Sequence, residues 1–394
     1  EELPAHHGEV RMQPSAVDSM DKYNENLTDV KEIFRKGDLR AIPKPLLKWY
    51  DNNRRILPWR EDPAPYRVWV SEIMLQQTRV EAVKPYFDRF LKELPDVAAL
   101  SDCPEEKLLK LWEGLGYYNR VRNMQIAAQT VMENYHGELP ADYEALTKLK
   151  GIGHYTAGAI ASIAFGIPVP AVDGNVLRVI SRVTEDDADI MKASVRTAME
   201  KDLLEIMPEN RAGAFNQALM ELGATVCLPN GAPLCEACPW KEVCRAQKSG
   251  RWRELPVKSK AKARRIEDRT VLVIKAEDKV LLHKRANKGL LAGLYEFPNV
   301  EGHLKEEEVI TYLKKMGLSP IRLKKLEDSR HIFSHIEWHM TGYAVQIDET
   351  EQEYQNMLFV DVKETEEQYP IPAAFSRYTG YMNIRLGNDR YKEE

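Results

Sequence analysis

The spacing of apolar residues changes part-way along this chain of 394 residues. From Ile42 to about Arg245, apolar residues recur every three or four positions, which is typical of helices. Beyond the polar, basic segment that follows, they alternate with polar residues, which is typical of strands with one buried face. The chain is also too long for one ordinary core. The sequence therefore predicts a multidomain protein with an all-α domain over 41–245, a basic linker over 246–268 and an α+β domain over 269–394.

Proline positions and apolar spacing locate the expected elements. Pro65 suits the first turn of a helix, and Pro85 suits a helix start or a kink. Helices are expected at 66–78, 85–94, 105–112, 119–133, 142–149, 156–165 and 194–207. In the α+β domain we expect a hairpin of 270–275 with 279–284, a helix at 305–316, and strands at 331–347 and 357–362.

The net charge of −5 argues against a nucleic-acid partner, but the charges are unevenly distributed. Residues 1–29 contain seven acids and two bases, so the tail over 1–40 is acidic and is expected to be poorly ordered. Residues 245–265 instead carry nine Lys or Arg and one acid, Glu254. Such a run is usually a solvated linker, and its value as a DNA-facing stripe depends on what flanks it. No stretch approaches the ~18 apolar residues of a membrane span, so no membrane partner is expected.

Four of the five cysteines lie within 18 residues, with the spacing C-x7-C-x2-C-x5-C. A secreted disulfide scaffold does not look like this in so long a chain, and a metal site in a reducing cytoplasm is favoured. Four thiolates at this spacing suit a tetrahedral zinc ion or a 4Fe–4S cluster. The expected ligands are Cys227, Cys235, Cys238 and Cys244.

A Gly-x-Gly turn at Gly151 and Gly153 joins two predicted helices within 149–157. The two glycines permit a tight turn and leave N–H groups free to bind a phosphate oxygen at the start of the next helix. Asp173 follows twenty residues after Gly153, and by itself it would be interpreted as a helix cap. Together, the hairpin, Asp173 and the cysteine loop over 227–244 resemble the helix–hairpin–helix glycosylase superfamily of DNA repair.

That resemblance implies functions for these residues. The cysteine loop is similar to the 4Fe–4S loop of the endonuclease III superfamily, although this chain has seven residues in the first gap where that family usually has six. We interpret the extra residue as a loop insertion. Asp173 is expected to stabilise positive charge on the sugar of an extruded nucleotide. Lyase members carry a nucleophilic lysine just before the hairpin threonine, Thr156; this chain has Tyr155 there, so an efficient β-lyase is not expected.

Three more segments resemble the MutY-type adenine DNA glycosylases, namely LPWR at 57–60, VWVSEIMLQQT at 68–78 and GLGYY at 114–118. Glu72 shares a helix face with Val68, Trp69 and Leu75. A lone glutamate is usually solvated, but on this face it is expected to be desolvated, which raises its pKa toward that of a general acid.

The same resemblance assigns contacts to DNA. Glu72 is expected to protonate N7 of adenine, with Tyr155 close to it and to Asp173. The flipped adenine leaves a space in the duplex, because its reacting atoms cannot be reached inside the stack. The implied adenine pocket contains Trp59, Arg60 and Leu75, and the implied DNA-binding residues are Gln77, Tyr117, Gly151, Gly153 and Thr156.

Residues 269–394 resemble a Nudix domain through LLAGLYEFP at 290–298. A Nudix hydrolase holds Mg2+ with glutamates on the helix that follows, whereas this chain has Lys314 and Lys315 at the equivalent place. The domain is therefore expected to bind rather than hydrolyse. In MutY-type proteins it recognises 8-oxoguanine through a Phe-Ser-His loop, which Phe333, Ser334 and His335 match.

The sequence thus predicts a monofunctional glycosylase that removes adenine opposite 8-oxoguanine or guanine in double-stranded DNA. It is expected to be a monomeric, cytoplasmic protein with a 4Fe–4S cluster. Two alternatives are a glycosylase with lyase activity on oxidised pyrimidines and a Nudix pyrophosphohydrolase with a DNA-binding region. Tyr155 and the Phe-Ser-His segment oppose the first, and Lys314 and Lys315 oppose the second.

Overall fold

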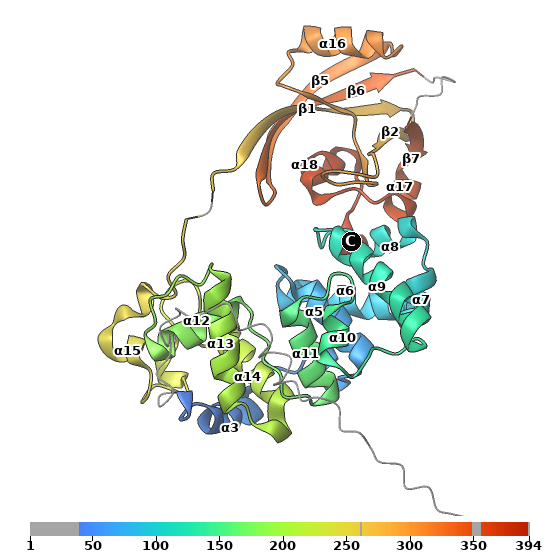
Figure 1. The fold of residues 1–394 in the computed structure, drawn as a ribbon. Coiled ribbons are helices and arrows are strands. Elements are labelled where there is room, and N and C mark those ends of the chain that lie inside the picture. Colours follow the sequence, from blue (N-terminus) through green and yellow to red (C-terminus); the bar gives the residue numbers. More distant parts are fainter. Residues whose placement is uncertain (1–38, 261, 349–355, 393–394) are drawn as a thin grey trace, which may run out of the picture. The chain divides into compact units, whose positions relative to one another are not determined.

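The structure is a computed structural model that describes residues 39–260, 262–348 and 356–392 (Figure 1). The predicted acidic tail lies outside the described residues except for Leu39 and Arg40. The chain forms two compact units. Of the described residues, the first contains 39–56, Pro63–Val68 and Pro140–Ser259, and the second contains Leu57–Asp62, Trp69–Leu139 and those from Lys260 onward.

The first unit is helical. Its core is formed by apolar residues of four helices and includes Leu46, Val176, Leu203 and Phe215. Its helices are α3 (Pro43–Asn53), α10 (Tyr143–Thr147), α11 (His154–Phe165), α12 (Gly174–Thr184), α13 (Ala193–Ile206), α14 (Ala212–Thr225) and α15 (Arg245–Ser249), with short 3-10 helices η1 (Glu209–Arg211), η2 (Cys235–Ala237) and η3 (Arg251–Arg253).

Helices α12 and α14 were not among those expected, because glycines that normally interrupt helices lie in or beside them. Close packing explains these glycines. A Cβ atom on Gly223 would stand 2.6 Å from Cβ of Asn175, and one on Gly213 would stand 2.6 Å from the carbonyl oxygen of Ser162. Glycine therefore lets α14 approach α11 and α12.

Helix α5 (Pro65–Leu75) begins in the first unit and ends in the second. It ends before the predicted position, so Gln76, Gln77 and Thr78 form a turn and not the end of a helix. Pro85 lies inside its helix rather than at the start. The other helices of this part are α4 (Pro58–Glu61), α6 (Val80–Glu93), α7 (Val97–Asp102), α8 (Glu105–Leu111) and α9 (Asn119–Tyr135).

The C-terminal part of the second unit is a mixed sheet with the order β3-β2-β1-β6-β5, in which β4 also pairs with β1 and β7 with β2. Strands β1 and β6 run parallel from Arg265 opposite Ile336 to Lys275 opposite Gln346. The strands are β1 (Arg265–Ala276), β2 (Lys279–Lys284), β3 (Tyr295–Glu296), β4 (Asn299–Glu301), β5 (Pro320–Ile332), β6 (Ile336–Ile347) and β7 (Met357–Asp361).

Two features of this sheet differ from the sequence predictions. The expected strand at 331–347 is wrong as a single strand, because β5 ends at Ile332 and β6 begins at Ile336. Among the described residues, strand β5 pairs with β6 alone, and most of its side chains lie in solvent. Its sequence is therefore polar and lacks the alternation that predicts a strand. Strand β1 begins at Arg265, inside the segment assigned to the linker.

Helices cover both faces of the sheet, with α16 on one side and α17 and α18 on the other (Figure 1). Alternate residues of β1 enter two separate cores, Val271 and Val273 in one and Leu272 and Ile274 in the other. This two-sided burial explains the continuous apolar run. The remaining helices are α16 (Glu306–Lys315), α17 (Val362–Gln368) and α18 (Ser376–Thr379), with η4 (Ala373–Phe375), η5 (Gly380–Met382) and η6 (Gly387–Tyr391).

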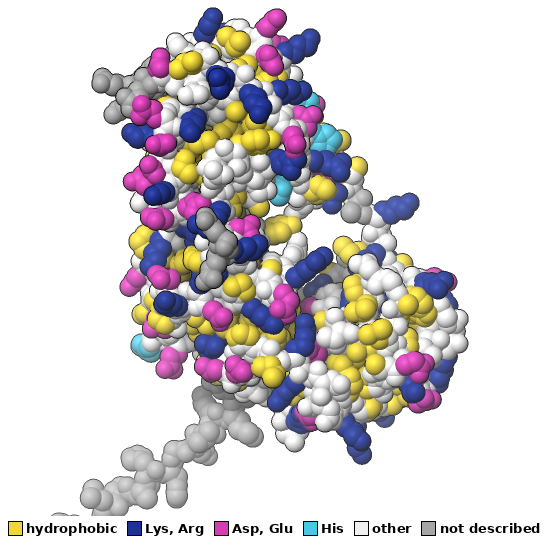
Figure 2. All heavy atoms as spheres, turned by 180° about the vertical axis from the view of Figure 1, so that it is seen from behind, with side chains coloured by type: hydrophobic (Ala, Val, Ile, Leu, Met, Phe, Trp, Pro, Cys, Tyr) yellow, Lys and Arg dark blue, Asp and Glu magenta, His cyan; other side chains and the backbone are white. Residues whose placement is uncertain are grey.

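The surface carries mixed charge. Lys and Arg side chains are spread among Asp and Glu side chains on the visible face of each unit, and they form no continuous basic patch there (Figure 2). Within the described ranges, no helix combines the length and the apolar composition needed to cross a membrane.

Candidate active site

Glu72 lies on α5 and is 7% exposed, between the buried residues Trp69 and Ile73. Its predicted burial is therefore observed. Trp59 on α4 is also buried, and its ring meets Phe87 edge-on with centroids 5.3 Å apart. Arg60 and Leu75 are half-buried. The second unit thus contains Glu72 and all three residues of the predicted adenine pocket.

Gln77 and Tyr117 both occupy the left-handed backbone region, with φ of 60° and 48°. Residues other than glycine rarely adopt this backbone conformation, and where they do so at functional sites the surrounding structure enforces it. Tyr117 is 50% exposed, although it is a large aromatic residue. The two residues predicted to enter the duplex are therefore held in turns of unusual geometry.

Arg120 on α9 holds both turns. Its Nη1 donates to the carbonyl oxygens of Ile73 and Gln76 at 2.6 and 2.7 Å, and its Nη2 donates to those of Leu115 and Gly116 at 3.0 and 3.1 Å. Burial lowers the pKa of Arg120 to about 10, so the guanidinium remains charged at neutral pH. No sequence pattern indicates this function of Arg120, because its partners are backbone carbonyls that only the fold brings together.

In the first unit, the predicted helix–hairpin–helix turn precedes α11. Gly151 has φ of +78°, and Gly153 is the N-cap of α11 with no atom near the position that a Cβ would take. The backbone at this helix start is therefore open to a ligand, as phosphate binding requires. Thr156 is buried, and the hydroxyl of half-buried Tyr155 donates to the sulfur of Met220 at 3.8 Å.

Asp173 caps α12, so the simplest interpretation of a lone aspartate is correct for its local role. Its Oδ1 accepts from the backbone N–H of Val176 and its Oδ2 from the side-chain amide of Asn175, both at 2.8 Å. Burial raises the pKa of Asp173, and these hydrogen bonds oppose the increase. The cap therefore orients a carboxyl group that is largely removed from water.

The segment that leads into Asp173 is anchored by Asn216 of α14, which is fully buried. Its Oδ1 accepts from the N–H of Ala171 at 3.1 Å, and its Nδ2 donates to the carbonyl of Val169 and the hydroxyl of Ser162, each at 2.8 Å. An asparagine inside an apolar helix face was the only signal in the sequence. A buried amide needs such partners, and here they position Asp173.

Two arginines of α12 contact the cysteine loop. Arg178 donates from Nε to the carbonyl of Cys227 at 2.9 Å and from Nη2 to Oδ1 of Asn175 at 2.8 Å. Arg182 donates from Nη1 to the sulfur of Cys227 at 3.3 Å. The loop is further anchored by buried Trp240, whose Nε1 donates to the carbonyl of Ile42 at 3.1 Å.

All four clustered cysteines line one pocket, together with Arg182 and Trp252. Burial raises the pKa of the Cys238 thiol to about 12 and that of Cys244 to about 11. A bound cation would reverse this by favouring the thiolates. Across the described residues, no three His, Cys, Asp or Glu side chains are placed closely enough to hold a metal ion.

Phe333, Ser334 and His335 form the turn between β5 and β6. The ring of Phe333 packs edge-on against Trp338, with centroids 5.0 Å apart, while Ser334 and His335 are exposed. Phe333 therefore anchors the turn, and the other two side chains are available to a ligand. Lys314 and Lys315 are exposed at the end of α16.

Similar proteins place the chain in a family. The HhH-GPD superfamily base excision DNA repair protein family matches residues 70–205, and the NUDIX domain family matches 269–379. The adenine DNA glycosylase of Mus musculus is 36% identical over 371 residues, which cover 79% of this chain and 72% of the mouse protein. The chain belongs to the adenine DNA glycosylase family. The adenine DNA glycosylase of Buchnera aphidicola (Schizaphis graminum strain) is 34% identical over 304 residues, covering 77% of this chain and 86% of that protein.

A solved structure of a thermostable thymine-DNA glycosylase is 27% identical, covers 54% of this chain and 98% of its own, and aligns with a TM-score of 0.49. The family and domain matches make this chain a DNA N-glycosylase of base excision repair with a helix–hairpin–helix domain and a Nudix-like domain. The predicted family, fold class and enzyme class are confirmed.

Proposed function

We propose that this protein removes adenine from double-stranded DNA where the adenine lies opposite 8-oxoguanine or guanine. The observation that carries the proposal is the buried carboxyl group of Glu72 in a chain of the adenine DNA glycosylase family. Adenine is a poor leaving group, so its removal needs an acid that is still protonated near neutral pH. Burial of a carboxyl group generally favours its protonated form, which is the form that a general acid needs.

The proposed reaction is a hydrolysis. Glu72 donates its proton to N7 of the flipped adenine while the bond between C1′ and N9 breaks. The ionised carboxylate of Asp173 stabilises the positive charge that develops on the sugar. Water then adds to C1′ and gives a proton to Glu72, which restores the acid and leaves an abasic site. Tyr155 takes the position of the lyase lysine, and its hydroxyl cannot form a Schiff base, so the strand stays intact.

The cysteine loop is proposed to hold a 4Fe–4S cluster. The four cysteines line a single pocket, and thiolates are the ligands that such clusters require. When bound, the cluster would cross-link the loop through four iron–sulfur bonds. Arg178 joins the loop to the segment of Asp173, which gives the loop a positioning function. Reduced thiolates suit a cytoplasmic protein, and we propose that it acts as a monomer.

The turn at 333–335 is proposed to recognise 8-oxoguanine. Ser334 and His335 are exposed and can donate to or accept from the damaged base, while Phe333 holds the turn on the sheet. Lys314 and Lys315 lack the oxygen ligands that Mg2+ needs, which favours recognition over pyrophosphate hydrolysis.

An assay on two duplexes tests this function. One carries adenine opposite 8-oxoguanine and the other adenine opposite guanine, and each product is analysed with and without alkali. We expect faster release of adenine from the first duplex and strand breaks only after alkali. Strand cleavage without alkali would instead support the lyase alternative, and pyrophosphate release from nucleoside triphosphates with Mg2+ would support the hydrolase.

A further inference from the structure

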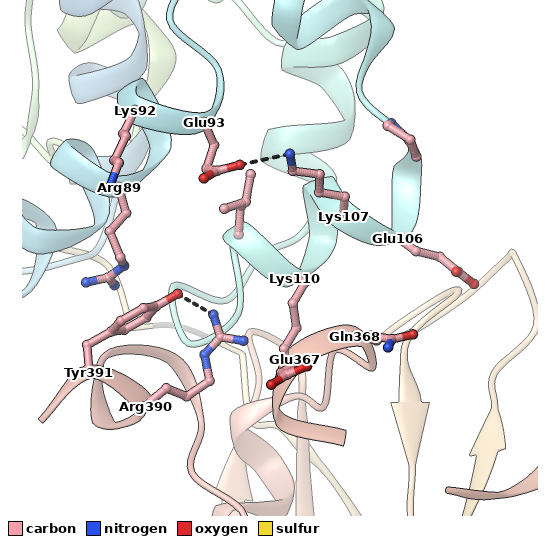
Figure 3. Close-up of a pocket in the computed structure, with 12 residues that line it drawn as sticks. Arg89, Lys92, Glu93, Glu106, Lys107, Lys110, Glu367, Gln368, Arg390 and Tyr391 are labelled. Atoms are coloured by element: carbon pink, nitrogen blue, oxygen red, sulfur yellow. Dashed lines mark hydrogen bonds and ion pairs between the residues drawn. The ribbon is translucent and has the colours of Figure 1, made fainter. Parts of the chain in front are cut away.

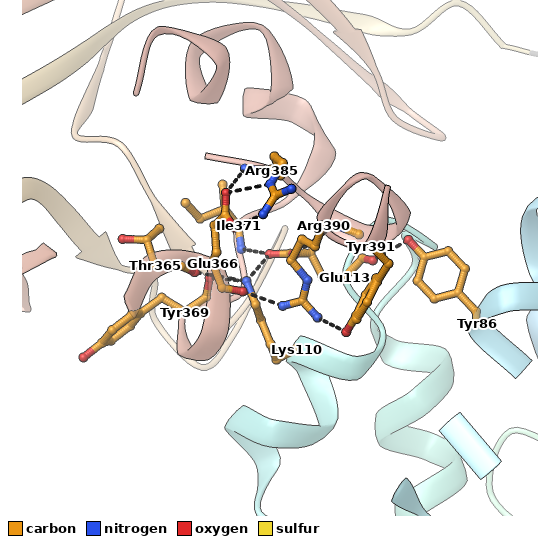
Figure 4. A network of polar contacts seen from close by, with 11 residues as sticks. Tyr86, Lys110, Glu113, Thr365, Glu366, Tyr369, Ile371, Arg385, Arg390 and Tyr391 are labelled. Atoms are coloured by element: carbon orange, nitrogen blue, oxygen red, sulfur yellow. Dashed lines mark hydrogen bonds and ion pairs between the residues drawn. The ribbon is translucent and has the colours of Figure 1, made fainter. Parts of the chain in front are cut away.

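A buried ion pair joins the helices of the second unit to its C-terminal domain (Figure 4). Lys110 at the end of α8 and Glu113 just after it lie 2.9 Å apart, and the side chain of Glu113 is fully buried. The carboxylate accepts from two backbone N–H groups of the C-terminal domain, those of Ile371 at 2.9 Å and Gly387 at 3.1 Å. Lys110 donates to two carbonyls of the same domain, at Thr365 and Tyr369, each at 3.1 Å.

A buried ion pair contributes to stability only when the other donors and acceptors of both charged groups are also hydrogen-bonded. A buried charge that loses its partners is strongly destabilising. Here the C-terminal domain supplies backbone partners to both charges, so the docked arrangement is the one in which both are satisfied. Beside the buried pair lies an open pocket lined by charged side chains (Figure 3). There the guanidinium of Arg89 of α6 lies 4.0 Å from the ring centre of Tyr391.

Glu113 is also the residue before the loop that carries Tyr117. Its carbonyl accepts from the hydroxyl of Tyr86 at 2.6 Å. Gly114, with φ of +96°, packs so closely on Gly387 that a Cβ would stand 3.3 Å from the Cα of Gly387. Arg120 holds the next two residues of the loop. The C-terminal domain therefore determines where this loop begins.

Packed side chains in the core of the C-terminal domain connect Ile371, which binds Glu113, to the turn at 333–335. Ile371, Trp338 and Phe375 belong to one buried cluster, and Phe333 packs against it. The ring of Trp338 meets Phe375 with centroids 6.0 Å apart. A chain of packed side chains and hydrogen bonds can carry coupling between two sites when it has two discrete arrangements that both sites favour differently.

We propose that Glu113 is a positioning residue through which the C-terminal domain holds the Tyr117 loop, so that binding of the damaged base favours insertion of Tyr117. The inference rests on the proposed function, because it assumes that Tyr117 enters the duplex and that the turn reads the lesion. Glu113 acts through the loop alone.

The test compares Glu113→Gln and the charge-balanced Lys110→Met/Glu113→Gln with wild type and with Glu106→Gln. Glu106 also pairs with the C-terminal domain, at 2.6 Å from Lys284, but both side chains are exposed, so it is a matched control. Single-turnover excision is measured on adenine opposite 8-oxoguanine and opposite guanine, and hydrogen exchange is followed at the amides of Ile371 and Gly387.

Both Glu113 variants should exchange these amides faster and lower the preference for the damaged pair about tenfold, within the roughly 5–150-fold range of coupled sites, while excision opposite guanine stays within about twofold. Glu106→Gln should match wild type. If a folded Glu113 variant keeps the wild-type preference, or slows both duplexes by the same factor, the proposal is wrong. A wild-type protein that releases adenine from neither duplex would contradict the proposed function instead.

Discussion

At the scale of single residues, the two carboxyl groups of the proposed reaction have different surroundings. Glu72 is buried on α5, where Trp69 and Ile73 are buried as well. Asp173 is buried as well, but it accepts two hydrogen bonds as the cap of α12. Hydrogen bonds to a carboxylate favour its charged form, and apolar surroundings favour the neutral form. At Asp173 burial outweighs these hydrogen bonds and raises the pKa of the carboxyl group.

The first prediction concerns the proton of Glu72. Glu72→Gln keeps the shape of the side chain and removes its titratable group. Excision of adenine should fall by about 10²–10⁴-fold, the contribution typical of general acid catalysis, while affinity for the mispaired duplex is retained. Single-turnover rates and dissociation constants measure the two effects. Wild-type rates in the variant would remove Glu72 from the mechanism.

The second prediction concerns pH and stability. The pKa of Asp173 is raised above its usual value of 3.8 in the folded protein. A raised pKa favours folding below the usual value, and this contribution is lost as the pH rises through the raised pKa. As the pH rises from about 3.8 through the raised pKa of Asp173, the unfolding free energy of wild type should therefore decrease relative to that of Asp173→Asn. The variant should also lose excision activity.

Urea unfolding at a series of pH values tests this linkage. Asp142→Asn is the matched control, since Asp142 caps α10 through the N–H of Ala145 but is exposed. The difference in unfolding free energy between Asp142→Asn and wild type should vary less with pH than the difference between Asp173→Asn and wild type. A constant difference between wild type and Asp173→Asn across the range would show that burial of Asp173 does not affect folding.

At the scale of elements, Arg120 connects the end of α5 to the loop before α9. Arg120→Lys keeps the charge, but one ammonium group cannot bridge four carbonyls in the geometry of a guanidinium. We expect excision to fall about 10²-fold, as for a displacement of about 1 Å at a reacting group, with little change in non-specific DNA affinity. Arg122→Lys, on the same helix and paired with Glu105 at 2.7 Å, is the control. Equal losses in the two variants would contradict a specific role for Arg120.

The turn between β5 and β6 gives the fourth prediction. Replacing Ser334 and His335 with alanine should weaken binding to adenine opposite 8-oxoguanine by about 1–3 kcal/mol for each lost base contact, and binding opposite guanine much less. Ser319→Ala, an exposed serine of the same domain, should change neither. Dissociation constants for both duplexes test whether the loss of affinity is selective for 8-oxoguanine. The same loss on both would make the turn a structural or backbone contact.

The elements differ in how well the sequence predicts them. Helix α11 follows from its glycine turn and apolar run, and the β1–β2 hairpin from its alternation, because both signals are local. Strand β5 does not, since its side chains are mostly exposed and, within the described part of the chain, its backbone pairs with β6 alone. Likewise Arg120 and Asn216 bind backbone groups from distant segments. No local pattern records such contacts, so the motif residues were found and the residues that position them were missed.

At the scale of the whole molecule, the compact units do not follow the change of hydrophobic period. Helices α6 to α9 form one unit with the sheet, and α11 to α14 form the other. The Lys110–Glu113 pair supplies a reason, because it joins α8 to the C-terminal domain through backbone groups. The predicted acid Glu72 belongs to one unit and Asp173 to the other.

The last prediction concerns charge outside the active site. The chain has a net charge of −5, yet nine of the 21 residues from Arg245 to Arg265 are basic. Lys260 is exposed in this run. If it contacts a phosphate, Lys260→Ala should weaken binding to every duplex alike and reduce the slope of log K against log salt by about 0.9, because one fewer counterion is released. Lys315→Ala, an exposed lysine of α16, should leave the slope unchanged. Binding measured at several salt concentrations, for both mispairs and an undamaged duplex, tests the difference. A loss confined to one mispair would mean that Lys260 reads the lesion and is not part of a general electrostatic contact.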